Sequence, residues 1–271
     1  MKIAVIWWFD KASWVYDKWR DGLRGAIDII GKKHKVAWYL DKTMPDPEDN
    51  YDFILLWDDS NSEFFEHIGK FSSKKGLCLT TMPQNFDNLR KLDIVFAESQ
   101  PVYDVLRANG IPVIKAFGTD TDFFKPTKQK KDIEYFYPAT FSPWKRQRDI
   151  AYLGNKLLCV GTLQPDGIED YEVCKREGVM IEEGYFPVKH IKDYYDRAEN
   201  VIIPAVHGSE RTVLESMSMN ILPTVVHPDV NKKAYSYIRE FKDSKFKTPR
   251  EFILDRYSSK VYAKQLLKGI L

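Results

Sequence analysis

The stretch that decides the fold runs from His207 to Asn220 (His-Gly-Ser-Glu-Arg-Thr-Val-Leu-Glu-Ser-Met-Ser-Met-Asn) and continues as Ile-Leu-Pro-Thr-Val-Val226. It predicts a buried strand from Asn200 to Val206, a short polar loop, a helix that carries Glu215, and a second buried strand. A helix that begins beside the carboxyl end of a strand presents free backbone N–H groups and its positive dipole end, which suit an anionic phosphate. Glu215 lies one turn into that helix, where a carboxylate can accept hydrogen bonds from ribose hydroxyls. An ordinary strand–helix–strand unit without a ligand is the alternative at this point.

The same alternation of strand and helix runs through the first half of the chain. Strands that alternate with helices form βαβ units and a parallel sheet. The predicted strands are residues 2–7, 34–39, 53–57, 76–80, 94–97 and 113–116, and the predicted helices are residues 12–30, 63–71 and 101–109. The pattern stops at Phe117-Gly-Thr-Asp-Thr-Asp-Phe-Phe-Lys-Pro126, and a polar, lysine-rich stretch follows to Lys131. We therefore predict a first domain over residues 1–124.

The second half of the chain repeats this theme and predicts a second domain over residues 125–257. Its predicted strands are residues 133–137, 157–161, 201–206 and 223–227, and its predicted helices are residues 189–198, 210–219, 231–241 and 258–270. Two doubly wound domains joined by a short linker would form a cleft, with ligands at the carboxyl ends of the strands. The last segment, residues 258–271, is amphipathic and able to return to the first domain.

Composition restricts the class of protein. The 271 residues are 44% hydrophobic and 14% aromatic, which supports two sizeable cores and excludes a disordered chain. A net charge of +2 gives no indication of nucleic-acid binding. Cys78 and Cys159 lie inside apolar strand-like runs, and Cys174 stands apart. We therefore expect neither disulfides nor a zinc site, and we expect the protein to work in a reducing compartment. No long apolar segment is visible, so we expect a cytoplasmic protein without a membrane span.

Glu215 and the run Ser216-Met-Ser-Met-Asn220 resemble the donor-sugar signature of retaining GT-B glycosyltransferases, the group 1 or family-four-like enzymes that use nucleotide sugars. That family has an E-x7-E motif before Ala-Met and a Gly-x-Pro-Val-Val strand. The segments 94–99, 110–114 and 118–126 resemble the family's crossover between domains, so the resemblance extends over residues 94–270. It implies an α/β protein of GT-B architecture, with two Rossmann-like doubly wound domains facing across a cleft and the last helix packed on the first domain.

The resemblance assigns roles around the central motif, with departures. Glu215 would bind the nucleotide ribose. His207 replaces the first acid of the motif and would face the donor sugar, while Glu210 is placed to supply the missing carboxylate. Asn220 replaces the usual glycine, and Pro223 comes one residue late. The helix start would hold the phosphates through Gly208, Ser209, Arg211 and Thr212.

A basic residue is also expected in the loop after the first strand of the second domain. Lys145 would neutralise the leaving diphosphate, which gains negative charge in the transition state. The family's arginine in this loop is absent, because Ala139 and Thr140 stand at the Gly-Arg position, so Arg146 or Arg211 would have to compensate. The alternative for Lys145 and Arg146 is a solvated surface pair. Tyr185 or Phe186 would stack on the nucleotide base, the alternative being simple packing.

The acceptor side is expected at the strand ends of the first domain. Trp8 offers an aromatic face for a sugar, and Asp10 a polar contact to the acceptor hydroxyl, with Asp58-Asp59 as further candidates. Asp120-Thr-Asp122 has the spacing of a metal-binding motif, but its place in the linker indicates turn and capping residues instead.

The sequence therefore predicts a metal-independent glycosyltransferase that moves a sugar from a nucleoside-diphosphate donor, of the UDP or GDP type, to an acceptor hydroxyl with retention. No other cofactor is expected, the acceptor is a carbohydrate or another hydroxyl compound, and the oligomeric state is open. There are two alternatives. The first is a catalytically silent nucleotide-sugar binding protein, and the second is a nucleotide-sugar epimerase or hydrolase on the same fold.

Overall fold

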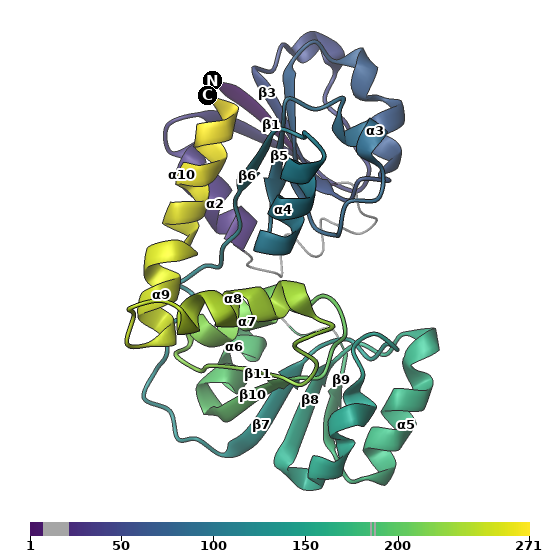
Figure 1. Cartoon of the computed structure of the whole chain (residues 1–271), viewed down its shortest axis with the longest axis vertical. Helices are drawn as coiled ribbons and strands as arrows, with labels where there is room; N and C mark the ends of the chain where they lie inside the picture. Colours follow the sequence, from purple (N-terminus) through teal and green to yellow (C-terminus); the bar gives the residue numbers. More distant parts are fainter. Residues whose placement is uncertain (8–21, 185, 187) are drawn as a thin grey trace. The chain divides into compact units, whose positions relative to one another are not determined.

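The computed structural model describes residues 1–7, 22–184, 186 and 188–271 (Figure 1). They divide into two compact units. Unit 1 comprises Met1–Gly118 together with Tyr257–Leu271, and unit 2 comprises Thr119–Arg256. Unit 1 thus contains both ends of the chain, and the units divide after Gly118, whereas the sequence analysis set its boundary at residue 124.

Unit 1 is built on a six-stranded parallel sheet with the strand order β2-β1-β3-β4-β5-β6. Its strands are β1 (Lys2–Trp7), β2 (Lys35–Tyr39), β3 (Phe53–Asp58), β4 (Lys74–Leu79), β5 (Ile94–Ala97) and β6 (Val113–Lys115). The chain first adds β2 on one side of β1 and then β3 to β6 on the other, which is the doubly wound arrangement.

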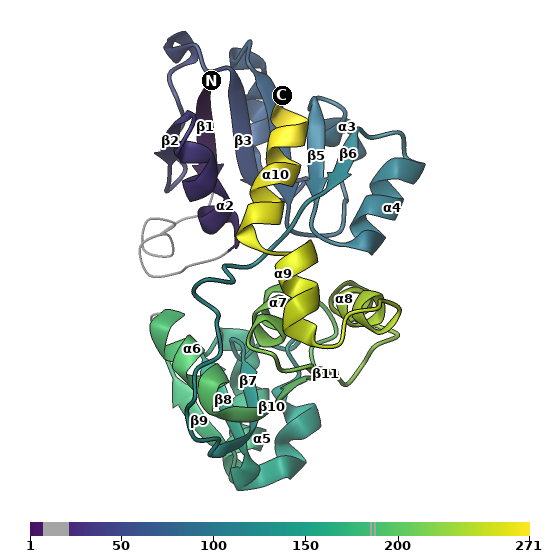
Figure 2. The ribbon, with the colours of Figure 1, turned by 90° about the vertical axis from the view of Figure 1, so that its left-hand side faces the viewer.

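The two faces of this sheet carry separate apolar cores, because successive side chains of a strand point to opposite faces. Ile3, Val5 and Trp7 face one core, and Ala4 and Ile6 face the other. The first core is covered by α2 (Gly22–Gly31) and α10 (Ser259–Ile270), which lie side by side in Figures 1 and 2. The second is covered by α3 (Phe86–Leu89), α4 (Gln100–Ala108) and the 3-10 helices η2 (Glu63–Glu66) and η3 (Ile68–Lys70). A further 3-10 helix, η1 (Pro47–Asp49), is exposed.

The C-terminal helix is held in unit 1 by a cap and by packing. The Ser258 hydroxyl accepts a hydrogen bond from the Val261 backbone N–H, which satisfies one of the free donors at the start of α10. Leu266 and Ile270 are buried in the core that α2 also covers. Gly269 lies so close to the Phe96 ring that a Cβ would be 2.7 Å from it. The last helix therefore completes the core of a unit whose other elements precede it by more than a hundred residues.

Unit 2 has a five-stranded parallel sheet in the order β11-β10-β7-β8-β9. Its strands are β7 (Ile133–Pro138), β8 (Leu157–Gly161), β9 (Met180–Glu183), β10 (Ala198–Ile203) and β11 (Thr224–Val225). Its helices are η4 (Gln147–Lys156), η5 (Pro165–Gly167), α5 (Ile168–Arg176), α6 (Val188–Arg197), α7 (Glu210–Ser218), α8 (Lys232–Lys242) and α9 (Pro249–Arg256). Helix α7 contacts α8 and α9, and α6 lies against β7 and β10.

Several predicted elements differ from the observed ones for identifiable reasons. The helix predicted over residues 63–71 is wrong: the backbone bonds there span three residues, as in the bond from His67 N–H to the Phe64 carbonyl, and form η2 and η3. The strand predicted to reach Val206 ends at Ile203, because Pro204 has no N–H for the ladder. The predicted helix over residues 12–30 is described only from Gly22, since residues 12–21 lie outside the described residues.

The central motif folds as predicted. Helix α7 begins at Glu210 and ends at Ser218. Asn220 follows with φ +64°, a left-handed conformation that glycine favours after a helix and that asparagine tolerates best among the other residues. Arg250 of α9 then holds this end of α7 by donating to the Ser218 carbonyl at 2.5 Å and to the Phe124 carbonyl at 2.9 Å.

No helix in the described part of the chain is long and apolar enough to cross a membrane.

Candidate functional site

The site is organised by the loop that joins β10 to α7. Gly208 and Ser209 both have left-handed backbone conformations, with φ +71° and +79°, and together they turn the chain from the strand end into the helix. The Ser209 side chain makes no capping hydrogen bond to the helix. The first N–H groups of a helix have no partner inside the helix, so this start of α7 points uncapped donors and a positive dipole end outward.

Lys145 lies directly beside this helix start. It belongs to the loop after β7, where its backbone N–H donates to the Ser142 carbonyl at 2.9 Å. Its ammonium donates to the Ser209 hydroxyl at 3.3 Å. A Cβ on Gly208 would be 2.9 Å from the Lys145 Nζ atom, so glycine at this position leaves room for the ammonium. The structure thus brings together Lys145, Gly208 and Ser209, three residues that the sequence analysis assigned to the phosphates.

The charges at this point are predominantly positive. Burial lowers the pKa of Lys145, the nearby charges of Arg211 and Lys233 lower it further, and Glu210 opposes them. Glu210 is itself ion-paired with Lys233, whose ammonium is 3.4 Å from its carboxylate. Within the described residues, no carboxylate lies within ion-pair distance of the Lys145 ammonium. An ammonium that is largely desolvated and has no carboxylate at ion-pair distance in this part of the chain is favourably placed to pair with an external anion.

His207 is exposed at the same helix start. Its ring lies nearly parallel to the Trp144 ring, with centroids 5.7 Å apart and an interplanar angle of 14°. The Trp144 carbonyl also accepts the Val206 backbone N–H at 3.0 Å, which ties the loops together. Partial desolvation and the charge of Lys145 lower the pKa of His207, so the neutral ring predominates at pH 7.

Glu215 lies on the buried face of α7. It is 4% exposed, and one of its carboxylate oxygens accepts a hydrogen bond from the Tyr195 hydroxyl at 3.3 Å. The same hydroxyl lies 3.5 Å from the Thr212 carbonyl. Burial and the adjacent Glu215 raise the pKa of Tyr195 well above its usual range, so Tyr195 stays a donor. Glu215 is thus a buried carboxylate whose orientation is set by a fully buried tyrosine of α6.

Arg146 is directed away from the helix start into a different cluster. Its guanidinium binds both carboxylate oxygens of Asp149, at 2.7 and 3.2 Å, and the His227 Nε2 atom lies 2.6 Å from the same carboxylate. Thr140, at the position of the family's arginine, bonds to Thr162 through its hydroxyl. Arg211 is therefore the arginine whose charge acts on Lys145. Phe186 is half-buried, and Tyr185 lies outside the described residues.

Asn231 is a component of the site that the sequence analysis missed. It is 2% exposed, and its side-chain NH2 donates to the carbonyls of Ala205 and Gly208, both at 3.0 Å. Its amide oxygen caps α8 by accepting from Ala234 N–H. One side chain therefore fixes the turn before α7 and starts the helix that carries Lys233. An asparagine at a helix start is visible in sequence, but its contact with residues about twenty-five positions earlier is not.

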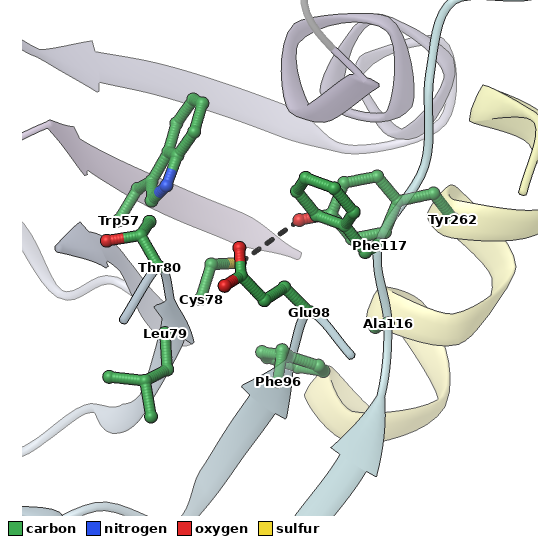
Figure 3. Close-up of a pocket in the computed structure, with 9 residues that line it drawn as sticks. All are labelled: Trp57, Cys78, Leu79, Thr80, Phe96, Glu98, Ala116, Phe117 and Tyr262. Atoms are coloured by element: carbon green, nitrogen blue, oxygen red, sulfur yellow. Dashed lines mark hydrogen bonds between the residues drawn. The ribbon is translucent and has the colours of Figure 1, made fainter. Parts of the chain in front are cut away.

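The expected acceptor residues Trp8 and Asp10 lie outside the described residues. Asp58, also a candidate, is 4% exposed at the end of β3, and burial raises its pKa to about 6. A small cavity opens near the carboxyl ends of β3 to β6 (Figure 3). Aromatic rings and the Glu98 carboxylate line it, and in Figure 3 the Tyr262 hydroxyl donates to the Cys78 sulfur at 3.6 Å.

The aspartates of the linker are turn residues, as predicted. The Asp120 carboxylate accepts the backbone N–H groups of Asp122 and Phe123 at 3.2 and 3.1 Å. Over residues 1–7, 22–184, 186 and 188–271, no group of three or more His, Cys, Asp or Glu side chains is arranged to hold a metal ion.

No protein-family model matches the chain, and no curated protein sequence matches it. Solved structures do match. AviGT4, a glycosyltransferase involved in avilamycin A biosynthesis, is 13% identical with a TM-score of 0.64, over 100% of this chain and 97% of that chain. An alpha-glucosyltransferase in complex with UDP and a 13-mer DNA containing an HMU base is 11% identical with a TM-score of 0.60, over 100% of this chain and 99% of that chain. S. aureus MnaA in its UDP co-structure is 10% identical with a TM-score of 0.59, over 100% of this chain and 96% of that chain. The chain has the α/β fold of GT-B glycosyltransferases, which confirms the predicted fold class.

Proposed function

We propose that this protein is a glycosyltransferase that moves a sugar from a nucleoside-diphosphate donor, of the UDP or GDP type, to an acceptor hydroxyl. The fold supports this proposal, because AviGT4 and the alpha-glucosyltransferase share it over nearly their whole length. Two of the similar structures also hold UDP. Fold alone does not define an activity, so the proposal depends on the site.

The observation that carries the proposal is the position of Lys145. Its ammonium lies at the start of α7, bonded to Ser209 and with no carboxylate at ion-pair distance among the described residues. Arg211 adds a second positive charge. This arrangement fits a diphosphate, which would accept from the uncapped N–H groups of α7 and pair with Lys145. When the bond to the sugar breaks, negative charge grows on the departing diphosphate, and the fixed positive charges stabilise it.

The remaining donor contacts follow from the same helix. Glu215 would accept hydrogen bonds from the ribose hydroxyls with a carboxylate that Tyr195 orients. His207, neutral and stacked on Trp144, would donate one hydrogen bond to the sugar and accept another. Glu210 is the other acidic candidate, but its pairing with Lys233 favours an electrostatic role over a sugar contact.

Retention of configuration and independence of metal ions are further parts of the proposal. In a retaining transfer, the acceptor attacks from the face that the diphosphate leaves, and the diphosphate oxygen accepts the acceptor's proton. Such a step needs positive charge around the diphosphate, which Lys145, Arg211 and the α7 dipole supply. The acceptor would meet Trp8 and Asp10, and we propose a cytoplasmic location.

The experiment is an assay of released nucleoside diphosphate with a panel of nucleotide sugars, each with and without candidate acceptors. Release that depends on an acceptor supports the transferase. Release without an acceptor indicates a hydrolase, and a sugar change without release indicates an epimerase. A rise in melting temperature with UDP but no turnover over the whole panel would identify a binding protein. A chelator in parallel reactions tests metal independence, and the anomeric configuration of the product tests retention.

A further inference from the structure

We propose that Asn231 is a positioning residue that aims the Ser209 backbone N–H at the diphosphate of the donor. This inference rests on the proposed function, because it concerns the diphosphate site at the start of α7. Asn231 is 2% exposed and lies immediately before α8. It acts through the backbone of the turn that it holds and does not itself touch the donor.

The side-chain amide of Asn231 is hydrogen-bonded at both ends. Its oxygen accepts from the Ala234 N–H at 3.4 Å and so caps α8. Its NH2 group donates to the carbonyls of Ala205 and Gly208, each at 3.0 Å. An amide NH2 group has two hydrogens, so each of them is committed to one carbonyl. The directions of both carbonyls, which lie on the path from β10 into α7, are therefore set by one buried side chain.

A carbonyl held in one direction also fixes the N–H of the next residue, because the two groups point to opposite sides of a planar, trans peptide. The first of the two peptides shows this. The Ala205 carbonyl faces Asn231, and the Val206 N–H on the other side donates to the Trp144 carbonyl at 3.0 Å. Trp144 precedes Lys145 in the loop after β7. The side of this peptide away from Asn231 is thus the side on which the Lys145 loop lies.

The second peptide is held in the same way, but its N–H is open. The Gly208 carbonyl faces Asn231, so the Ser209 N–H points away from Asn231. Among the described residues, this N–H has no hydrogen-bond partner. The Ser209 hydroxyl accepts from the Lys145 ammonium at 3.3 Å, so an open N–H donor and an ammonium meet at one residue. A phosphate paired with Lys145 is therefore within reach of a hydrogen bond from the Ser209 backbone.

The turn needs this support because its backbone is strained. Ser209 has φ +79°, a left-handed conformation that a residue with a Cβ rarely adopts. The two hydrogen bonds from Asn231 oppose relaxation of the turn. Without them, the peptide between Gly208 and Ser209 is free to rotate, and its N–H loses a fixed direction. A donor that is held in place before the ligand arrives reduces the ordering cost that the ligand's own contacts must offset.

Asn231→Ser tests the inference, because serine caps a helix about as well as asparagine does but has no NH2 group to bond the two carbonyls. Affinities for UDP, inorganic pyrophosphate and uridine are measured by calorimetry for the wild type and the variant. We expect UDP and pyrophosphate to bind about 10-fold more weakly to the variant, as expected for the loss of one hydrogen bond to a charged group. Uridine, which has no phosphate, should bind equally well to both.

The Ser209 N–H can also be observed directly, by NMR of protein labelled with 15N-serine. Its resonance is identified as the one that disappears in Ser209→Ala. Pyrophosphate should shift this resonance strongly downfield in the wild type and much less in Asn231→Ser. An unshifted Ser209 resonance in wild-type protein saturated with pyrophosphate would contradict the inference, and this measurement decides even if Asn231→Ser fails to fold.

Asn85→Ser is the matched control, since Asn85 caps α3 in unit 1 by accepting from the Asn88 N–H at 3.1 Å. It should leave the affinities for UDP and pyrophosphate unchanged. Equal pyrophosphate affinity in Asn231→Ser and the wild type, or equal weakening of pyrophosphate and uridine, would overturn the inference while leaving the proposed function intact. A wild-type protein that binds neither UDP nor pyrophosphate would remove both.

Discussion

The Lys233 ammonium lies 3.4 Å from a carboxylate oxygen of Glu210, and the two side chains are only 12% and 7% exposed. Removal of one member of a buried pair leaves the other charge without compensation. We therefore expect Glu210→Gln to destabilise the protein by about 3 kcal/mol, in the range measured for broken buried pairs. Urea unfolding measures this change. The double variant Glu210→Gln with Lys233→Met should recover most of the loss, and a double variant no more stable than the single one would contradict the pairing.

Lys145→Met should have opposite effects on binding and on stability. Loss of the ammonium should weaken UDP binding about 10- to 100-fold, as expected for a charge-assisted contact. The free protein should melt at a higher temperature, because methionine removes a cation whose pKa is lowered by burial. A lowered lysine pKa means that folding disfavours the protonated form. The stability gain is therefore largest at neutral pH and shrinks as the pH rises toward 10.5.

Lys156→Met is the control for this experiment, since Lys156 is an exposed lysine of unit 2 paired with Glu134. It should change neither the UDP affinity nor the melting temperature appreciably. If Lys145→Met bound UDP like the wild type, Lys145 would lose its place in the site.

Glu215→Gln should weaken UDP binding without affecting inorganic pyrophosphate, because the ribose is the group that Glu215 would contact. We expect a loss of about 10-fold, corresponding to about 1.4 kcal/mol for a weakened pair of hydrogen bonds to a charged group. Glutamine keeps the volume and one acceptor oxygen for Tyr195, so the fold should be preserved. Calorimetric titrations with the two ligands check this result, and an unchanged UDP affinity would remove Glu215 from the ribose site.

His207→Ala should reduce turnover with the natural donor far more than it weakens binding of the bare nucleoside diphosphate. The reason is that the ring, held against Trp144, would contact the sugar and not the nucleotide. Its lowered pKa places the neutral form at pH 7, so wild-type turnover should fall on acidification as the ring gains a proton. Initial rates and UDP affinities of both proteins measure the difference. Parallel losses of UDP affinity and melting temperature would indicate that His207 only packs at the strand end.

Asp58→Asn should stabilise the protein in a pH-dependent way. Burial raises the pKa of Asp58 from 3.8 to about 6, so the folded state holds the proton more tightly than the unfolded state. Ionisation of Asp58 therefore costs stability as the pH rises from about 4 through about 6. At pH 7.5 the variant should be more stable by up to about 3 kcal/mol, since one pKa unit corresponds to about 1.4 kcal/mol.

The comparison is made by urea unfolding at pH 4.5 and 7.5. The advantage of the Asp58→Asn variant should be small at the lower pH and large at the higher one. A constant difference at both pH values would show that Asp58 has an ordinary pKa.

The sequence by itself determined the regular elements and the fold class. Strand and helix periodicity is local, so β1, β5 and β8 appear at their predicted residues, and α7 begins at Glu210 as its motif indicates. Elements without a clear pattern escaped prediction. Helix α9 buries the adjacent Phe252 and Ile253 instead of residues at helical spacing, and the edge strand β9 has polar residues at Glu182 and Glu183.

Only the tertiary structure decided which side chains of the site act together. In the sequence, Lys145 and Ser209 lie in two separate loops. The parallel sheet brings these loops together, so that the Lys145 ammonium lies 3.3 Å from the Ser209 hydroxyl. The same process turned Arg146 toward Asp149, joined Lys233 to Glu210, and placed Asn231 under the turn before α7. Adjacent strands of a parallel sheet bring together the carboxyl ends of segments that are far apart in the chain. Side-chain direction and pairing there depend on packing and charge, which sequence spacing does not encode.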